Sequence, residues 1–150
     1  MSKDKHKNFL DKAHKIAKKK FGSTFPNPVV GCLIVNKNKI ISSGVTAVEG
    51  RPHAELNAIN DASKTLNNYR LLNCNLYVTL EPCHMCAKAI IDARIKNVYF
   101  SALEPKTGSV ISIDNFFDNS FLNHKVHYFS GLMQEESSRL LKDFFLERRH

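Results

Sequence analysis

Apolar and polar residues alternate along the chain with two different periods, which predict both helices and strands. Between residues 9 and 20, apolar residues recur every three or four positions, as on one face of an amphipathic helix. Residues 30–35 and 39–46 are rich in β-branched residues and are separated by a short polar turn, which predicts a β-hairpin. Residues 53–63 then return to the helical period.

Strands and helices continue to alternate in the second half of the chain. The predicted elements are a strand over 76–80, a helix over 83–94, strands over 98–103 and 126–129, and a closing helix over 134–149. Residues 104–124 carry no regular pattern, and an irregular stretch of that length is usually functional or disordered. The alternation predicts an α/β fold with helices on both faces of one sheet, formed as a single domain over residues 1–150.

Two short motifs carry the candidate chemistry. His53-Ala54-Glu55 opens one predicted helix, and Pro82-Cys83-His84-Met85-Cys86 opens the next. Three protein ligands leave the fourth position of a tetrahedral zinc ion open to water, which is the arrangement of a catalytic site. We therefore predict that His53, Cys83 and Cys86 bind zinc and that Glu55 is the catalytic carboxylate, which does not bind the metal.

The spacing of these residues suits a hydrolytic reaction. Cys83 and Cys86 are three residues apart in the first turn of a helix, so both sulfurs face one side and the helix dipole stabilises their thiolates. Glu55 is placed to take a proton from the zinc-bound water, a role typically worth about 10²–10⁴-fold in rate. The predicted reaction is attack of hydroxide on an amidine-like carbon, followed by loss of ammonia. A structural zinc site would need a fourth protein ligand, and no other histidine stands at a matching spacing.

Charge, cysteine content and hydropathy indicate the kind of partner and the cellular location of the protein. The net charge is +8, and residues 1–20 hold eight lysines against two aspartates. This excess favours an acidic partner such as nucleic acid, although a solvated lysine face on the first helix explains it equally well. Cys32 lies in an apolar run and is expected to be a core thiol. No apolar run suits a membrane span or a secretory signal, so a cytoplasmic location without membrane contact is predicted.

Longer segments resemble a known family. The pattern H-x-E…P-C-x-x-C is the signature of the cytidine deaminase-like zinc deaminases. Within that superfamily, residues 76–87 resemble the bacterial tRNA-specific adenosine deaminases, as do Glu104-Pro105-Lys106-Thr107-Gly108 and the C-terminal segment that includes Arg148-Arg149. The resemblance covers residues 68–149. It implies a three-layer α/β/α sandwich around a mixed, roughly five-stranded sheet.

The resemblance also implies an activity and its partners. The substrate would be the wobble adenosine of a tRNA anticodon loop, converted to inosine by a homodimer with one zinc ion per subunit. Glu104 and Lys106 would lie near the bound nucleotide, and Arg148 and Arg149 would contact the anticodon stem.

The N-terminal part departs from this pattern. Residues 26–32 and the Gly50-Arg51-Pro52 segment before His53 resemble the deaminase domain of riboflavin biosynthesis. The tRNA enzymes usually carry a Gly-x-Asn segment where this chain has Gly44-Val45-Thr46, so their pocket asparagine is missing, and Asn27 is expected to take over part of its role.

Three functions therefore remain to be separated. The riboflavin enzymes place several residues between their two cysteine ligands, whereas this chain has two, which favours the tRNA enzymes. The alternative is a small-molecule deaminase, acting on the riboflavin-pathway aminopyrimidine or on another nucleobase or nucleoside. A zinc-stabilised RNA-binding module without catalysis is the third, and Glu55 argues against it.

Overall fold

The computed structural model describes residues 3–20, 28–47 and 53–148, with backbone alone for residues 144, 145, 147 and 148. The elements in chain order are α1 (Lys3–Lys19), β1 (Gly31–Asn36), β2 (Lys39–Val45), α2 (Ala54–Leu66), β3 (Asn75–Leu80), α3 (His84–Asp92), β4 (Asn97–Ala102), the short 3-10 helix η2 (Phe116–Asp118), β5 (His127–Ser130) and α4 (Gln134–Arg148). None of the helices in the described ranges is both long and apolar enough to cross a membrane.

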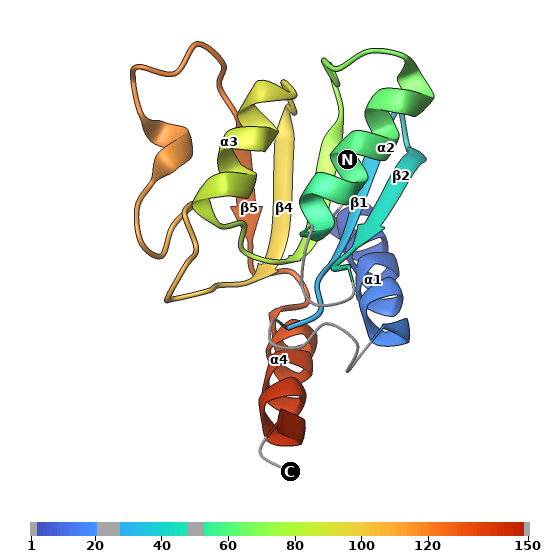
Figure 1. Cartoon of the computed structure of the whole chain (residues 1–150), viewed down its shortest axis with the longest axis vertical. Coiled ribbons are helices and arrows are strands. Elements are labelled where there is room, and N and C mark those ends of the chain that lie inside the picture. Colours follow the sequence, from blue (N-terminus) through green and yellow to red (C-terminus); the bar gives the residue numbers. More distant parts are fainter. Residues whose placement is uncertain (1–2, 21–27, 48–52, 149–150) are drawn as a thin grey trace.

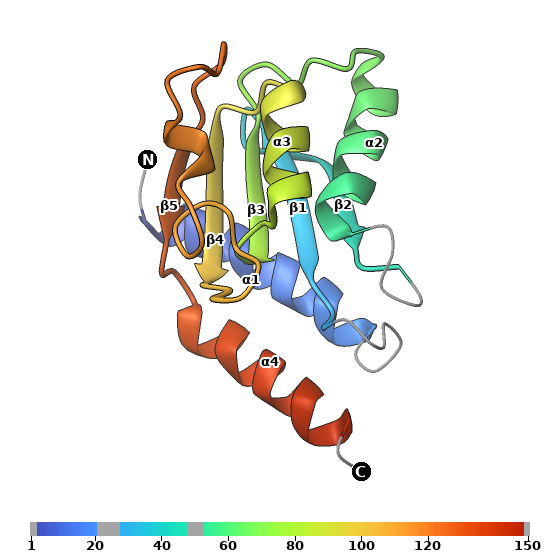
Figure 2. The same ribbon diagram turned by 60° about the vertical axis from the view of Figure 1, so that its left-hand side comes forward.

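The strands form one mixed sheet in the order β2-β1-β3-β4-β5. β1 pairs antiparallel with both β2 and β3, whereas β3, β4 and β5 run parallel to one another. Helices α2 and α3 cover one face of this sheet and α1 crosses the other (Figures 1 and 2). The expected three-layer α/β/α sandwich with a mixed five-stranded sheet is confirmed.

Each face of the sheet has its own apolar core. Ile34, Val78 and Phe100 pack under α2 and α3, and this core also contains Cys32, which is fully buried as predicted for a core thiol. Leu33 and Tyr77, one position along the same strands, pack under α1 instead. Neighbouring residues of a strand point to opposite faces, so the two-residue period seen in the sequence supplies both cores.

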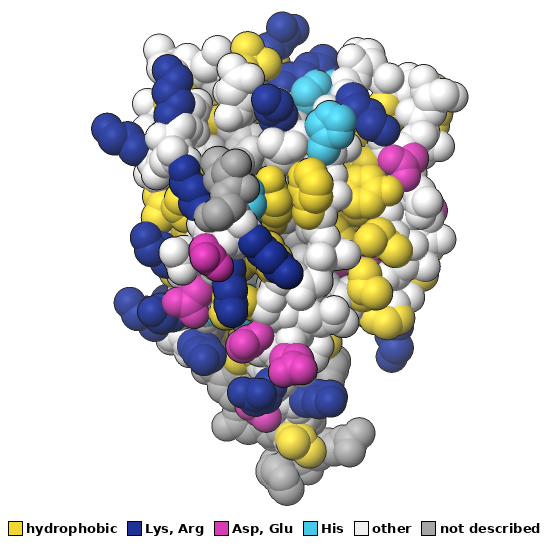
Figure 3. All heavy atoms as spheres, turned by 180° about the vertical axis from the view of Figure 1, so that it is seen from behind, with side chains coloured by type: hydrophobic (Ala, Val, Ile, Leu, Met, Phe, Trp, Pro, Cys, Tyr) yellow, Lys and Arg dark blue, Asp and Glu magenta, His cyan; other side chains and the backbone are white. Residues whose placement is uncertain are grey.

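Helix α1 begins at Lys3, whereas the apolar pattern predicted a start near residue 9. The difference comes from His6, whose ring stacks on Tyr99 with centroids 4.0 Å apart. His6 Nδ1 and the Tyr77 hydroxyl lie 2.6 Å apart, within hydrogen-bond distance. Tertiary contacts of a polar residue therefore extend the helix beyond its apolar stripe. Basic side chains spread over the face that α1 covers, with a few acidic ones among them (Figure 3).

Residues 104–124 contain η2 and carry two buried aromatic side chains. Phe116 and Phe117 join the core under α3. This irregular stretch is therefore packed against the sheet layers, and its first part reaches the candidate site described below.

Helix α4 lies beyond one end of the sheet and projects away from the sandwich (Figures 1 and 2). The Ser137 hydroxyl near its start donates a hydrogen bond to the carbonyl oxygen of Thr79. Leu140 and Leu141 are half-buried beside Leu80 at the end of β3. The side chains of Phe144 and Phe145 lie outside the described residues.

Candidate functional site

The two predicted motifs meet at the end of the sheet where α2 and α3 begin. His53 is the residue that caps the start of α2, Cys83 caps the start of α3, and Cys86 lies in the first turn of α3. Gly44 of β2 lets α2 approach closely, because a Cβ atom there would lie 2.3 Å from the carbonyl oxygen of Ala54. Strand packing thus fixes the helix that carries His53.

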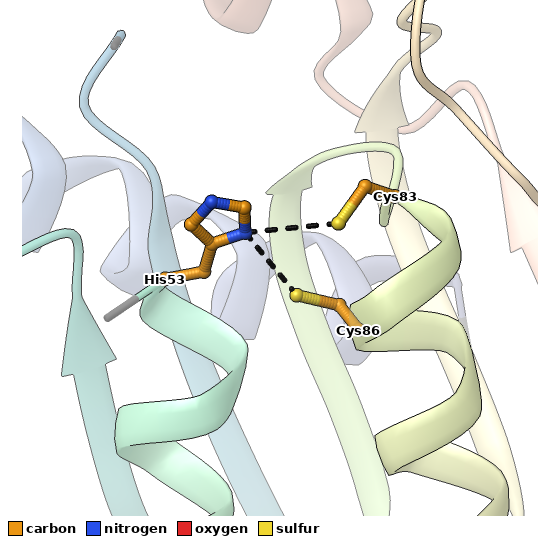
Figure 4. Close-up of side chains that lie close together, drawn as sticks. All are labelled: His53, Cys83 and Cys86. Atoms are coloured by element: carbon orange, nitrogen blue, oxygen red, sulfur yellow. Dashed lines mark hydrogen bonds between the residues drawn. The ribbon is translucent and has the colours of Figure 1, made fainter. Parts of the chain in front are cut away.

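The three predicted ligands form a compact cluster (Figure 4). His53 Nδ1 lies 3.4 Å from the sulfur of Cys86 and 3.7 Å from that of Cys83. Zinc binds sulfur at about 2.3 Å and nitrogen at about 2.0–2.1 Å, so a tetrahedral ion would hold the two donors roughly 3.5 Å apart. The cluster therefore fits zinc, with Nδ1 as the histidine donor. Among the described residues it is the one group of histidine, cysteine and acidic side chains found with this proximity.

The two thiols of the cluster differ in their acidity. A hydrogen bond from Cys86 is the main cause that lowers the pKa of Cys83 to about 4. The same hydrogen bond, reinforced by burial, raises the pKa of Cys86. The hydrogen bond therefore stabilises one thiolate in the pair. Binding of zinc would require both cysteines to be deprotonated, because the thiolate is the form that binds metal.

Glu55 lies beside this cluster but is not one of its three members. Its side chain is 4% exposed and lines the same cavity as His53 and Cys83. Burial, and to a lesser degree the neighbouring Cys83, raise the pKa of Glu55 to about 7. A carboxyl group with such a pKa exchanges protons readily near neutral pH, which is what a general acid–base catalyst needs.

The cavity in front of the cluster has a volume of about 110 Å³. Typical ligand sites of roughly 300–1,000 Å³ are larger, so this one accepts a small group. Its walls come from the starts of β1 and α2, the ends of β2 and β3, and the loop after β4. Thr46, Leu80 and Thr107 contribute side chains to these walls.

The remaining predicted contacts fall in different places. Glu104 lines the cavity, and its carboxylate accepts a hydrogen bond of 3.0 Å from the backbone N–H of Lys106. The Lys106 side chain itself is exposed and lies outside the cavity wall. Asn27 and Arg149 lie outside the described residues, and Arg148 is described as backbone at the end of α4.

Sequence reasoning missed two features of the site. Glu81 is buried in the cavity wall with its carboxylate surrounded by N–H groups, and the signal for it was an acidic residue at the end of an apolar strand. Ser109 lies within hydrogen-bond distance of His84 Nδ1, at 3.1 Å, and donates to Asp114 at 2.6 Å. His84 is thereby held away from the three-residue cluster.

The family of the chain follows from comparison with known proteins. The cytidine and deoxycytidylate deaminase zinc-binding region matches residues 3–102. A tRNA-specific adenosine deaminase of Haemophilus influenzae is 44% identical over 126 residues, which span 81% of this chain and 73% of that protein.

Two solved structures resemble the fold equally well. One, from a study of A-to-I editing by tRNA:A34 deaminases at the wobble position of transfer RNA, has a TM-score of 0.79 at 34% identity and covers 89% of this chain and 98% of its own. The other is a diaminohydroxyphosphoribosylaminopyrimidine deaminase and reductase of Thermotoga maritima, with a TM-score of 0.79 at 32% identity, covering 95% of this chain and 40% of its own. The fold alone does not distinguish between these two kinds of deaminase. The 44% sequence identity to the tRNA-specific adenosine deaminase does. The chain therefore belongs to the tRNA-specific adenosine deaminases, within the zinc-binding cytidine and deoxycytidylate deaminase family.

Proposed function

We propose that the protein converts the wobble adenosine of a tRNA anticodon loop to inosine. The observation that carries this proposal is the buried carboxylate of Glu55 in the same small cavity as the cluster of His53, Cys83 and Cys86. A zinc site that only stabilises a fold needs no such carboxylate, and it uses four protein ligands where this cluster has three.

The metal cluster and Glu55 have different roles in the proposed reaction. A zinc ion held by His53, Cys83 and Cys86, one per subunit, would lower the pKa of a bound water molecule from about 15.7 to roughly 7. Glu55 accepts one proton from the water and delivers it to a ring nitrogen of the base, and it then carries the second proton, from the hydroxyl on the attacked carbon, to the amine, which leaves as ammonia. The net reaction adds water to the base and releases ammonia.

The size of the cavity supports a single extruded base as the substrate. A base in a stacked duplex cannot reach a buried cluster, whereas an anticodon loop presents unpaired bases that a protein can enclose. We propose that Glu104 and Asn27 contact this base, that Lys106 faces its sugar or phosphate, and that Arg148 and Arg149 meet the anticodon stem. The basic chain favours such a partner.

We further propose that each chain is a single deaminase domain and that two chains form a homodimer. The segments around the cavity carry exposed apolar side chains, with Met85 48%, Ile111 41% and Ile113 59% exposed. Large apolar side chains on neighbouring exposed segments are typical of an interface. The free thiols of the chain, which include the two cysteines proposed to bind zinc, favour a reducing compartment and so the cytoplasm.

The test of the function compares two substrates. The purified zinc-loaded protein is incubated with an anticodon stem-loop that contains a wobble adenosine and, separately, with the riboflavin-pathway aminopyrimidine. Inosine is measured after nuclease digestion, and ammonia is measured in both reactions. Glu55→Gln removes the carboxylate, and Asp61→Asn, an exposed position on the same helix, is the matched control.

The proposal expects inosine from the stem-loop with wild type and Asp61→Asn, and a loss of about 10²–10⁴-fold with Glu55→Gln. Ammonia from the aminopyrimidine alone would replace the proposal with the small-molecule alternative. Zinc binding without turnover of either substrate would instead support the third alternative, a non-catalytic RNA-binding module.

A further inference from the structure

The carboxylate of Glu81 is surrounded by a loop that comes more than twenty residues later in the chain. The side chain is 3% exposed. One carboxylate oxygen accepts hydrogen bonds from the Glu104 N–H, at 3.0 Å, and from the Ser112 hydroxyl. The other accepts from the N–H groups of Val110, Ile111 and Ser112, at 3.1, 2.7 and 2.9 Å. Both oxygens are thus fully engaged with one loop.

This loop, residues 104–112, closes around the carboxylate with little free space. The N–H of Gly108 donates to the carbonyl oxygen of Glu104 at 2.8 Å, which turns the chain back on itself. A Cβ atom at Gly108 would lie 2.3 Å from the carboxylate of Glu81 and 2.7 Å from the same carbonyl oxygen. Any side chain at Gly108 would therefore displace the Glu81 carboxylate or the loop.

The loop also forms part of the candidate active site. Glu104 and Thr107 line the cavity, and Gly108 pairs with Cys83 in an isolated β-bridge. The N–H of Ser109 donates to the carbonyl oxygen of Pro82 at 2.9 Å. The cavity wall and Cys83, one of the proposed zinc ligands, are thus joined through the loop that Glu81 holds.

We propose that Glu81 is a positioning residue, whose carboxylate fixes loop 104–112 in the shape that places Glu104 and Thr107 against the bound base. This inference rests on the proposed deaminase function. Glu81 does not take part in proton transfer, because five hydrogen bonds occupy its oxygens. Glu55 is the buried carboxylate of the cavity that carries the proton.

The two roles are separated by replacing Glu81 conservatively. Glu81→Gln keeps the shape but puts an amide donor where the loop presents N–H groups, and Ser112→Ala removes one hydrogen bond while leaving the backbone ones. Asp92→Asn, an exposed carboxylate at the end of α3, is the control. Each variant is assayed for zinc content, thermal unfolding, kcat and KM on the stem-loop, and amide hydrogen exchange over residues 104–112.

We expect Glu81→Gln to retain zinc and to speed exchange at the four donor amides by about tenfold or more. Its KM should rise and its kcat/KM should fall by roughly 10–100-fold, as for other groups that orient a site from behind its contact residues. Ser112→Ala should show the same changes to a smaller degree, and it carries the test if Glu81→Gln does not fold.

The inference is overturned if loop exchange is unchanged in both variants. It is also overturned if kcat falls only in proportion to the zinc-loaded fraction while KM stays constant, since that is the behaviour of a merely structural residue. If the wild-type protein does not deaminate the stem-loop, the proposed function fails, and the exchange measurement still decides whether Glu81 fixes the loop.

Discussion

The hydroxyl of Thr46 accepts a hydrogen bond of 2.9 Å from the backbone N–H of Val30. It also lies 3.4 Å from the Val30 carbonyl oxygen, to which it donates. Thr46 stands at the position where the resemblance to the tRNA enzymes led us to expect an asparagine, and it lines the cavity while being 4% exposed. Its hydroxyl is therefore bonded to the backbone of Val30, the residue before β1.

Replacing Thr46 by valine tests this arrangement. The variant leaves the Val30 N–H without its acceptor, which should cost about 1–3 kcal/mol and lower Tm by several degrees. The kcat/KM for the stem-loop should stay close to that of wild type, because the hydroxyl does not face the base. Thermal unfolding and initial rates check both statements. An unchanged Tm with a large fall in kcat/KM would mean that the hydroxyl contacts substrate.

Removal of zinc should expose one unusually reactive thiol. In protein stripped by a chelator at pH 6, iodoacetamide should modify Cys83 about tenfold or more faster than the other cysteines, because its pKa is lowered to about 4 mainly by the hydrogen bond from Cys86. Burial raises the pKa of Cys32 and of Cys74. Peptide mass spectrometry identifies the modified residue.

Zinc added before the reagent should protect Cys83, and Cys83→Ser should abolish the fast phase. Modification of Cys32 or Cys74 at the same rate would contradict the assignment of the metal cluster.

Stability should depend on pH through His14 of α1. Its Nδ1–H donates to the Leu10 carbonyl oxygen at 2.8 Å, whereas its buried Nε2 has no hydrogen-bond partner among the described residues. Burial lowers the pKa of His14, while Glu136 and Asp11 oppose that shift and Lys18 adds to it. The unfolded chain therefore binds the proton more readily, so stability is present above about pH 6.5 and is lost as pH falls.

His14→Leu removes this proton-binding group and its unpaired nitrogen. We expect it to raise the free energy of unfolding by up to about 1 kcal/mol at pH 8 and by more at pH 5. Urea titrations at both values measure the difference. His127→Gln, at an exposed position, is the control. A gain of equal size at both pH values would refute the role of protonation.

The salt dependence of kcat/KM should distinguish RNA contacts made by the C-terminal arginines from RNA contacts made by the lysines of α1. The double variant Arg148→Ala and Arg149→Ala should lower kcat/KM on the stem-loop and reduce the slope of log kcat/KM against log salt by about 1 to 2, since each lost phosphate contact lowers counterion release. Lys18→Ala with Lys19→Ala on α1 is the comparison, because both lysines are exposed.

An equal reduction in both double variants would place RNA on α1 as well. A reduction in the lysine variant alone would refute the assignment to Arg148 and Arg149.

Most of the fold was predictable because its signals are local. The strands carry β-branched and aromatic residues, and the starts of α2 and α3 carry the motifs themselves. The start of α1 was not predictable, since His6 is held by Tyr77 and Tyr99 from strands far along the chain. A local pattern contains no information about such contacts.

The same distinction applies to the site. His53, Cys83 and Cys86 were predictable because side-chain chemistry and spacing define a zinc cluster, and the structure brings them together. Glu81 was not predicted, because its partners are mostly backbone N–H groups, which every residue except proline carries. The sequence signals for this arrangement are weak. They are the glycine at position 108 and the acidic residue at the end of an apolar strand.

The position of α4 bears on how such a protein evolves. This helix joins the sandwich near Ser137 and then extends past the sheet, away from the helices that carry the metal cluster (Figure 2). Mutations in its outer half can accumulate without moving His53, Cys83 or Cys86. If Arg148 and Arg149 meet the anticodon stem as proposed, substitutions at this end of the chain can change the RNA contacts while the metal cluster is inherited intact.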